Sequence, residues 1–492
     1  MPPPEPASWF LSRRIFLAGV ALVFALAFAS LAVQVLGLYG TQGIVPLGER
    51  MELLGSRVTG WSRLRFPTLF WFGASDALLR GTCALGIGAA LLAILGVLPR
   101  LSLALCWFLY LSFVCVGSPF LDFQWDALLL ETGLLAVVFA PTGLRPFGHN
   151  ERAPSASARG LVYGLLFKLM VLSGAVKLLS GDASWRDGSA LDFHYWTQPL
   201  PHRLSVLAAS APEWFQRLSC LVMFAIELGL PLLLLVPLWV RGLRVVVAAG
   251  VAILMAAVFL TGNYGFFNLL TAVLCLPLLD DATWRRLLRR APAARAPPPP
   301  RPRWRTFVHA LIAFPLALVS LSQVLTGLEW IGSAPEPIGN LHDALALTRS
   351  VNSYGLFRVM TKERPEIELE GSTDGKHWLP YRFRYKPGPL ERAPVFAGLH
   401  MPRLDWQMWF AALEYDRPYR SRWEDALLER LLENSPSVLA LLDENPFPSA
   451  PPRYVRASVA LYHFASPEER AQGRWWSRGA SQEFLPARER AR

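Results

Sequence analysis

One segment determines how the rest of the chain is interpreted: Lys168-Leu-Met-Val-Leu-Ser-Gly-Ala-Val-Lys177, which continues through Ser184-Trp-Arg-Asp-Gly-Ser189 to Pro199-Leu-Pro201. It begins as an apolar helix suited to lipid and ends in a turn rich in Asp, Trp and His. Two lysines lie inside the apolar part. An ammonium group in hydrocarbon costs at least ~3 kcal/mol on membrane-insertion scales, so each lysine needs water or a partner.

The composition is that of a membrane protein. The 492 residues are 53% hydrophobic and only 17% charged, whereas charged residues make up roughly 25% of soluble domains. The net charge of +11 comes largely from arginines in loops and in the C-terminal region. Nucleic-acid binding would need a basic face on a soluble domain, so we expect no nucleic-acid partner and assign the loop arginines to membrane topology. Membrane lipids are the expected surroundings.

Nine apolar segments approach the length of about 20 residues that a bilayer-spanning helix needs. The sequence therefore predicts a mainly α membrane protein, with a polytopic helical bundle of about nine spans over residues 1–326. The predicted spans are Ile15–Leu36, Gly81–Leu98, Leu101–Val116, Ala127–Phe139, Leu161–Leu179, Leu218–Val236, Leu243–Leu260, Phe266–Leu279 and Thr306–Thr326.

Loop arginines indicate the orientation of these helices. With the N-terminus inside, the inside loops hold Arg100, three arginines over 145–159, two over 241–244 and eight over 285–305, where a Pro-rich linker covers 291–302. The outside loops at 117–124 and 261–265 hold none, in agreement with the positive-inside rule. The longer loops over 39–80 and 181–217 hold several arginines, but long connections bias orientation less. An odd number of spans then sends residues 327–492 to the non-cytoplasmic side.

Residues 327–492 read as a β-rich soluble domain. Glu366–Glu370 and Trp378–Tyr385 alternate apolar and polar residues around the turn sequence Ser372-Thr-Asp-Gly375, which predicts a β-hairpin. Trp423–Leu442 is typical of helix, and Arg453–Phe464 is typical of another strand.

The two intramembrane lysines are the first candidates for chemistry. Lys168 and Lys177 are nine residues apart, about half a turn out of phase, so they cannot share a helix face. Lys177 is interpreted either as an interface anchor or ion-pair partner, or as a general base or ligand-binding cation. Glu131 and Glu227 lie within other spans and are candidate partners, either as interhelical ion pairs or as part of a proton or substrate path.

Polar residues at the outer ends of the helices are candidate binding residues. Asn263 and Asn268 suit either packing across helices or ligand contact. The outer turn holds Trp185, Asp187 and His194. A single His without a second ligand nearby is weak as a metal site, and the five cysteines lie in apolar segments without a CxxC pair, so we expect no metal. No P-loop, GxSxG, HExxH or Rossmann fingerprint occurs in a fitting context.

Several long strings resemble the lipase maturation factor family. They lie at Thr261–Asn268, Val351-Asn-Ser-Tyr-Gly-Leu-Phe-Arg-Val-Met360, Arg364-Pro-Glu-Ile-Glu368, Glu370-Gly-Ser-Thr-Asp-Gly375, Pro402-Arg-Leu-Asp-Trp-Gln-Met-Trp-Phe410, Glu444-Asn-Pro-Phe-Pro448 and Pro452-Arg-Tyr-Val455. Animal members of this family are endoplasmic-reticulum membrane proteins that secreted dimeric lipases need to reach an active fold. The resemblance implies a chaperone-like maturation factor without a cofactor, whose clients are secreted proteins, lipases among them, and whose C-terminal domain is lumenal.

The composition rich in Ala, Arg and Pro suggests a bacterial member, for which the bacterial inner membrane and the periplasm replace the endoplasmic reticulum and its lumen. If the protein is a maturation factor, Trp406, Trp409 and Phe410 are expected to be exposed aromatics that help to hold partly folded clients. The alternative is that these three residues form the core of their own domain.

The membrane half also resembles the helical domain of vitamin K-dependent γ-carboxylase, through Gly174-Ala-Val-Lys177 followed by Trp185 and Gly188. In the carboxylase, a lysine in this neighbourhood deprotonates the quinol cofactor. Lys177 is the position that would correspond, and Leu178 stands where the carboxylase has its second lysine. This resemblance implies an alternative function: a membrane enzyme that uses Lys177 as general base on a quinone-like lipid or another lipid-soluble substrate.

Overall fold

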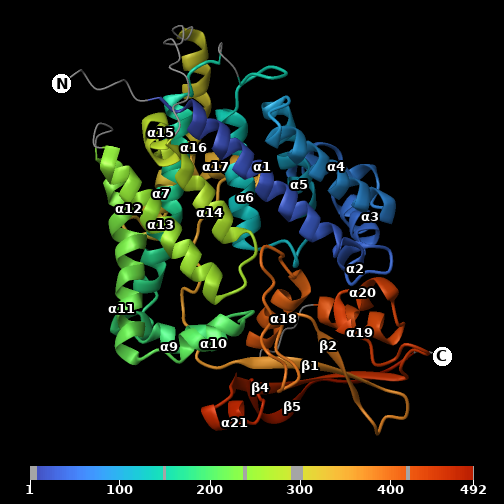
Figure 1. Cartoon of the computed structure of the whole chain (residues 1–492). Helices are drawn as coiled ribbons and strands as arrows, with labels where there is room; N and C mark the ends of the chain where they lie inside the picture. Colours follow the sequence, from blue (N-terminus) through green and yellow to red (C-terminus); the bar gives the residue numbers. More distant parts are fainter. Residues whose placement is uncertain (1–7, 148–150, 237–240, 290–302, 417–421, 491–492) are drawn as a thin grey trace.

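The computed structural model describes residues 8–147, 151–236, 241–289, 303–416 and 422–490. It consists of a helical bundle with a β-sheet at its lower end (Figure 1). The predicted Pro-rich linker over 291–302 lies outside the described residues.

The bundle is built around α1 (Phe10–Ala32), which contacts α4, α5, α6 and α14. Phe16, Phe24 and Phe28 of α1 are fully buried against these neighbours. The other main helices of the bundle are largely apolar, as expected for helices buried in protein and lipid. They are α4 (Asp76–Ile94), α5 (Pro99–Val114), α6 (Gln124–Phe139), α7 (Ala156–Leu179), α11 (Glu213–Phe224), α13 (Arg241–Thr261), α14 (Phe267–Cys275) and α16 (Arg303–Gly327).

Each predicted span coincides with one of these helices, but the count of nine spans is not confirmed. Five of the described helical segments are long and apolar enough to cross a membrane: Phe10–Ala32, Asp76–Ile94, Ala156–Leu179, Glu213–Leu235 and Gly242–Thr261. Three further apolar helices are shorter: Pro99–Val114, Phe267–Leu278 and Leu311–Gly327. These helices support a membrane protein by length and composition.

Short helices cover the ends of the bundle. Near the sheet lie α2 (Val35–Tyr39), α9 (Ala190–Thr197) and α10 (Arg203–Ala209). α3 (Leu47–Arg57) lies beside α4, and α8 (Ala183–Asp187) follows α7. At the opposite end lies α15 (Asp281–Leu288), and α17 (Glu336–Ala346) follows α16 and contacts it.

The sheet is antiparallel and five-stranded, in the order β3-β2-β1-β4-β5. The predicted hairpin is confirmed, since β1 (Pro365–Ser372) pairs with β2 (Leu379–Phe383). The predicted strand at 453–464 is β4 (Tyr454–Phe464), and β3 (Leu442–Glu444) and β5 (Trp476–Glu489) complete the sheet.

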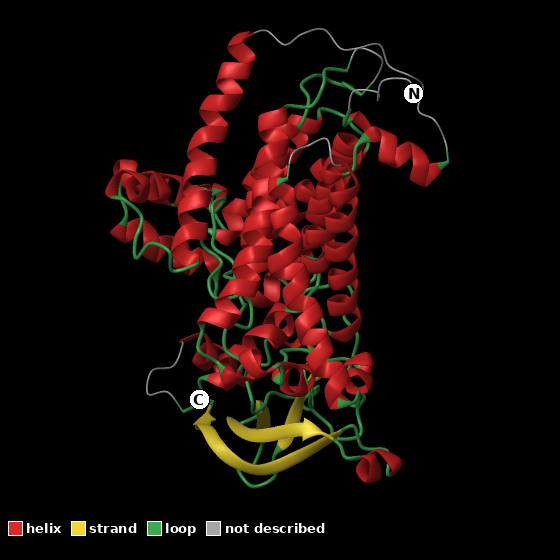
Figure 2. Ribbon diagram, turned by 90° about the vertical axis from the view of Figure 1, so that its left-hand side faces the viewer, coloured by secondary structure: helices red, strands yellow, loops and turns green. Residues whose placement is uncertain are grey.

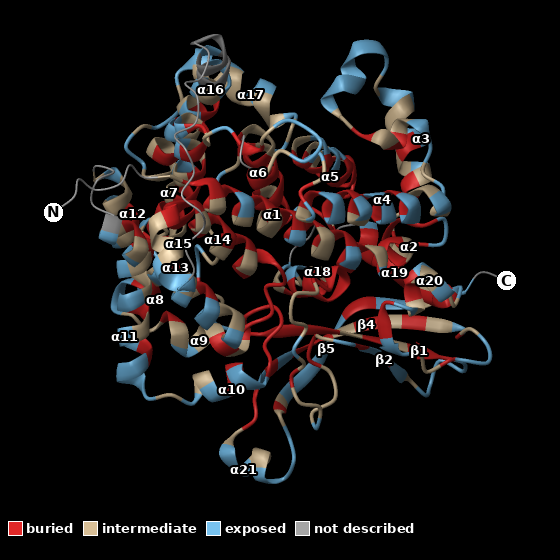
Figure 3. Cartoon of the chain, turned by 45° about the horizontal axis from the view of Figure 1, so that its top comes forward, coloured by how far each residue is buried: buried red, intermediate tan, exposed pale blue. Residues whose placement is uncertain are grey.

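Helices of the C-terminal half lie between the sheet and the bundle (Figures 1 and 2). They are α18 (Arg403–Leu413), α19 (Arg422–Leu432) and α20 (Pro436–Leu439), and α21 (Pro467–Ala471) lies at the far side of the sheet. Buried residues continue from the bundle through α18 and α19 into the sheet (Figure 3), so one hydrophobic core joins both halves. The domain boundary at residue 327 stays a prediction, because α16 ends there but residues 350–357 still lie against α6 and α7.

Candidate functional site

Lys168 is neutralised in the middle of the bundle. Its ammonium donates to Glu131 Oε1 of α6 at 2.6 Å and to Gln323 Oε1 of α16 at 3.0 Å. The Lys168 and Glu131 side chains are 1% and 5% exposed. A carboxylate at this distance replaces the water that the ammonium would otherwise need.

A segment from the C-terminal half completes the shell of Glu131. The backbone N–H of Asn352 donates to Glu131 Oε2 at 3.0 Å, and the hydroxyl of Tyr354 donates to the same oxygen at 2.7 Å. Both carboxylate oxygens therefore have partners, as a buried carboxylate requires. The string Val351–Met360 is thus a structural part of the bundle as well as the entry to the sheet.

Lys177 lies near the lower end of α7 and is paired as well. Its ammonium donates to both oxygens of Glu227, at 2.9 and 2.7 Å. Glu227 lies on a π-helical turn, η3 (Ala225–Gly229), that interrupts the helix starting at α11. The two lysines therefore use different neighbours, as their half-turn offset predicts, and the interhelical Lys–Glu pairing is confirmed for both.

Two of the predicted residues of the outer turn gather beside Lys177. The Trp185 ring centroid lies 5.4 Å from the Lys177 ammonium, and its indole N–H donates to the backbone carbonyl of Phe357 at 3.0 Å. His194 lies against the Phe357 ring, and its Nε2 is 3.3 Å from the Tyr264 hydroxyl. Burial, together with the charge of Lys177, lowers the pKa of His194 to about 4, so this imidazole is neutral at pH 7.

Asp187 does not belong to this cluster. It is exposed and accepts a hydrogen bond from the Ser189 backbone N–H at 2.9 Å. Hydrogen bonds from Ser189 lower the pKa of this carboxyl. Among the described residues, no group of three or more His, Cys, Asp or Glu side chains is placed to hold a metal ion.

The two candidate asparagines behave differently. Asn263 donates to the carbonyls of Leu200 at 3.0 Å and Val395 at 2.8 Å, and its Oδ1 accepts from the Ala397 N–H at 2.8 Å. Asn263 therefore fastens the loop before α14 to the C-terminal half. Asn268 is buried on α14, and no described residue hydrogen-bonds its side-chain amide.

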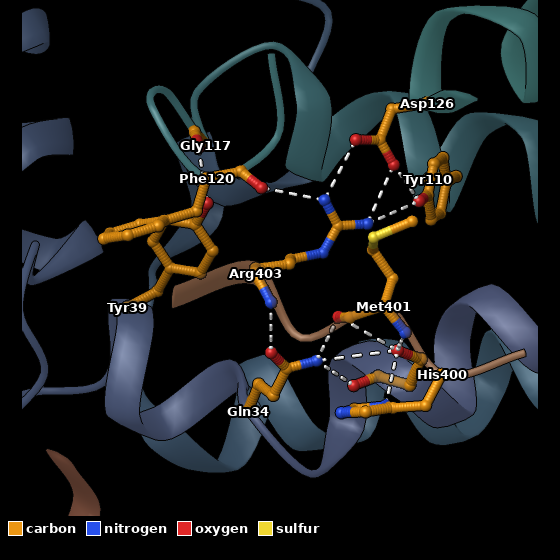
Figure 4. Close-up of polar contacts among 10 residues, drawn as sticks. Gln34, Tyr39, Tyr110, Gly117, Phe120, Asp126, His400, Met401 and Arg403 are labelled. Carbon is orange, nitrogen blue, oxygen red and sulfur yellow. Dashed lines mark hydrogen bonds and ion pairs between the residues drawn. The ribbon is translucent and has the colours of Figure 1, made fainter. Parts of the chain in front are cut away.

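A buried ion pair of Arg403 with Asp126 joins the two halves (Figure 4). The guanidinium of Arg403, at the start of α18, donates to Asp126 Oδ1 at 2.8 Å and Oδ2 at 2.9 Å, and to the Phe120 carbonyl at 2.7 Å. Both side chains are at most 1% exposed. Burial disfavours the charged guanidinium, but the Asp126 carboxylate outweighs it and raises the pKa of Arg403 above its usual value.

A second contact lies directly beside it, made by Ser30 near the end of α1 and by Gln34 just before α2 (Figure 4). The Gln34 amide accepts from the Arg403 backbone N–H at 2.8 Å and donates to the Met401 carbonyl at 2.9 Å. Ser30 Oγ lies 2.9 Å from His400 Nδ1. Together these bonds fix residues 400–403 on the lower ends of α1 and α6.

Trp406 and Trp409 are core residues, as the second of the two interpretations predicts, and are not exposed aromatics that could hold a client. Trp406 is 2% exposed and packs on Trp125 with ring centroids 4.6 Å apart, and Trp409 is 6% exposed and donates to the Thr197 carbonyl at 2.9 Å. α18 packs on β1 and, through Trp406, on Trp125 of α6, so both tryptophans form core. Phe410 is 38% exposed.

The sequence interpretation missed the junction residues Asp126 and Arg403 as a pair. The available signal was Arg403 inside the quoted string Pro402–Phe410, since a charged residue between buried aromatics needs a partner. Arg364 shows the same signal in Arg364–Glu368. It is buried, pairs with Glu366 at 2.7 Å and donates to the carbonyls of Trp196 and Pro199, each at 2.8 Å.

Two family models match the sequence of this chain, one in each half. The family described as "Lipase maturation factor transmembrane domain" matches residues 11–286, and "Lipase maturation factor C-terminal domain" matches residues 350–486. No solved structure matches the chain.

Individual relatives match along nearly the whole chain. Human Lipase maturation factor 2 is 35% identical over 97% of this chain and 82% of the relative, and the Gallus gallus protein of the same name is 34% identical over 96% and 81%. Lipase maturation factor 1 of Bos taurus is 31% identical over 97% of this chain and 89% of the relative. The chain, with its apolar helical bundle and its C-terminal sheet, therefore belongs to the lipase maturation factor family.

Proposed function

We propose that this protein is a chaperone-like membrane maturation factor that helps secreted or envelope proteins reach their active fold. Lipases are the first clients to test, because the relatives are named for lipase maturation. The proposed location is the bacterial inner membrane, with the C-terminal half in the periplasm. The arginine-poor loops at 117–124 and 261–265 lie at the end of the bundle that carries the sheet, which supports this orientation.

One observation carries the proposal: each of the two intramembrane lysines forms an ion pair with a buried glutamate. Lys168 pairs with Glu131 at 2.6 Å, and Lys177 pairs with Glu227 at 2.7 Å. In both pairs the amine is hydrogen-bonded to a carboxylate, whereas a general base needs its amine within reach of the proton of a substrate. The lysines therefore serve best as structural ion-pair partners, which leaves client handling to the C-terminal half that they help to support.

The test uses a host strain whose own copy of the gene is deleted. Activity of a secreted lipase is measured per amount of lipase protein, after restoring the wild type or the double variant Lys177→Leu/Glu227→Leu. The double variant replaces an ion pair by apolar residues, a change that is often neutral for stability. We expect it to restore the specific activity of the lipase as the wild type does.

Two outcomes decide against the proposal. If deletion leaves the lipase fully active per molecule, the protein is not a maturation factor for that client. If the double variant accumulates normally in the membrane but fails to restore lipase activity, the ion pair has a chemical role. The single variant Lys177→Leu is the control for folding, because it leaves Glu227 buried without a partner and should reduce accumulation.

A membrane enzyme is the second candidate. It would use Lys177 as base on a quinone-like lipid or another lipid-soluble substrate. The observation that favours it is the π-helical turn at Ala225–Gly229, since such turns occur frequently at functional sites and this one presents Glu227 to Lys177. This candidate predicts the second outcome above, so the same experiment separates the two functions.

A further inference from the structure

A groove runs along α7 on the side that faces α16. It has a volume of about 660 Å³ and is lined from Ser157 to Lys168 on α7, by Ala313 to Val324 on α16 and by Leu234 and Leu235. Eleven residues of helix correspond to a length of about 17 Å. We call it the α7–α16 groove. Its volume falls within the roughly 300–1,000 Å³ of pockets that hold small organic ligands.

Glycines determine the shape of the α7–α16 groove. At its lower end, Gly327 of α16 packs so closely that a Cβ there would lie 2.5 Å from Leu172 of α7. Higher up, Cβ atoms added at Gly160 and Gly164 would meet nothing within 4 Å. The two helices therefore touch below and separate above, and Figure 2 shows the upper end of α16, which follows the grey trace, extending above the top of the bundle.

The lower end of the α7–α16 groove is polar although it lies deep in the bundle. Lys168 is about 18 Å from the start of α7, near the middle of a hydrocarbon layer about 30 Å thick. Glu131, Ser320 and Ser350 line the groove beside it. Ser320 Oγ lies 3.4 Å from the Lys168 amine, and no described residue accepts a hydrogen bond from its hydroxyl.

The walls above this polar end are apolar and partly uncovered. Phe314 and Leu321 of α16 are 69% and 55% exposed, and Leu235 is 71% exposed. Because α7 is long and apolar enough to cross a membrane, these side chains and the open strip at Gly160 and Gly164 face hydrocarbon chains. A lipid tail fits this part of the groove.

We propose that the α7–α16 groove binds a neutral lipid, with its oxygen-bearing head at Ser320 and Lys168 and its tail along Gly160 and Gly164. The head is uncharged because it lies in the middle of the membrane, where Lys168 is already neutralised by Glu131 and a phosphate would have no counter-charge. An ester or hydroxyl oxygen in that position accepts a hydrogen bond from the free Ser320 hydroxyl. The charged head of a phospholipid stays at the membrane surface, so it forms no hydrogen bonds with Ser320 or Lys168 at the polar end of the groove.

The test compares two photoactivatable lipids in nanodiscs that hold the full-length protein. One is a diacylglycerol with a diazirine in its tail, and the other is a phosphatidylcholine with the same tail. After irradiation, labelled peptides are identified by mass spectrometry. We expect the diacylglycerol to label residues 157–168 and 313–324 at least fivefold more than the phosphatidylcholine, and we expect unlabelled diacylglycerol to compete.

Two variants make the test specific to the groove. Gly164→Leu fills the α7–α16 groove without a clash, so diacylglycerol labelling should fall at least fivefold while the thermal unfolding midpoint stays close to that of the wild type. Gly88→Leu on α4 is the matched control, since Gly88 is an exposed helical glycine with nothing within 4 Å of an added Cβ, and its labelling should not change. Ser320→Ala should lower diacylglycerol labelling and leave phosphatidylcholine labelling unchanged.

The proposal is overturned if both probes label the groove equally, which indicates surrounding lipid only, or if Gly164→Leu labels like the wild type. It is also overturned if the variant Gly160→Cys crosslinks two copies of the chain, because the groove would then be a helix–helix interface.

Discussion

Arg403 links the C-terminal half to the helical bundle. Its guanidinium is held by Asp126, Phe120 and Tyr110, all from the bundle. We expect Arg403→Met to lower the free energy of unfolding by about 3–5 kcal/mol, because the Asp126 carboxyl would remain buried without its ion-pair partner. Chemical unfolding in detergent, followed by tryptophan fluorescence, measures this change.

Two comparisons control that prediction. The double variant Arg403→Met/Asp126→Leu should recover most of the lost stability, since the buried charge is removed with its partner. The exposed pair of Arg382 with Glu444 is 44% and 53% exposed, so Arg382→Met should cost less than about 1 kcal/mol. Equal losses for Arg403→Met and Arg382→Met would contradict the argument.

His400 makes the junction sensitive to acid. Burial, reinforced by Arg403 and Arg384, lowers the pKa of His400 from 6.5 to about 4. Between these values the unfolded chain binds the proton and the folded protein does not, so stability falls as the pH decreases from 6.5 to 4, by up to about 1.4 kcal/mol per pH unit for one proton.

The measurement is the thermal unfolding midpoint across pH 7 to 4. We expect the unfolding midpoint of His400→Asn to decrease less than that of the wild type as the pH falls. The variant lacks the imidazole that takes up a proton on unfolding. His377→Asn is the control, since His377 lies in an exposed turn beside Asp374. An unchanged pH profile for His400→Asn would show that other groups cause the acid sensitivity.

At the residue scale, the sequence predicted the right charged residues but only some of their partners. Lys168, Lys177, Glu131 and Glu227 stand out because each interrupts an apolar run. Their pairing depends on helix rotation and on the π-helical turn at Glu227, and neither has a clear sequence signal. Asp126 lies in the first turn of α6, and its partner is 277 residues away in the chain.

At the scale of elements, the segment Val351–Met360 packs into the helical bundle without forming a helix or a strand. It has no regular secondary structure, yet it lies against α6 and α7 and supplies Asn352 and Tyr354 to Glu131. Gly355 allows this approach, because a Cβ there would lie 2.7 Å from Val176 of α7. We expect Gly355→Val to lower the free energy of unfolding by about 1–3 kcal/mol through overpacking.

The matched control is Gly388→Val. Gly388 also lies in an irregular segment of the C-terminal half, and nothing lies within 4 Å of an added Cβ. Its variant should unfold within about 0.5 kcal/mol of the wild type. If Gly355→Val is equally stable, the close contact between this segment and α7 is not needed.

Prediction of elements succeeded where periodicity is strong. The apolar runs became helices and the alternating stretches became β1, β2 and β4. The edge strands β3 and β5 were not predicted, because β3 is only three residues long and the exposed stretch of β5 lacks a regular apolar alternation. Length alone did not settle which helices span the membrane, since α5, α6 and α14 are shorter than a full crossing.

At the scale of the whole molecule, the proposed orientation places the sheet outside the cytoplasm. The turn after β1 is exposed at Lys376, and the opposite end of the bundle is exposed at Arg145. We expect a membrane-impermeant maleimide to label Lys376→Cys in intact spheroplasts and to label Arg145→Cys only after lysis. Four of the five native cysteines are buried, so background labelling should be low. Reversed labelling would place the C-terminal half in the cytoplasm.

The close union of the two halves could not be predicted from the sequence. Composition separates an apolar part from a soluble part, which suggests two domains joined by a linker. The structure instead buries Arg403, Gln34 and Asn263 between them. Such contacts depend on three-dimensional packing between residues far apart in the chain, and local patterns carry no information about them.

The separation of Asp126 from Arg403 has a consequence for how the protein is made. A ribosome that adds about 5–20 residues per second needs roughly 14–55 s to travel the 277 residues between them. During that time α6 is already in the translocation machinery with its carboxylates uncovered, and Glu131 also waits for Asn352 and Tyr354. Final assembly of the bundle therefore follows synthesis of the C-terminal half, and a chain cut short before residue 403 keeps unpaired charges that membrane quality control can recognise.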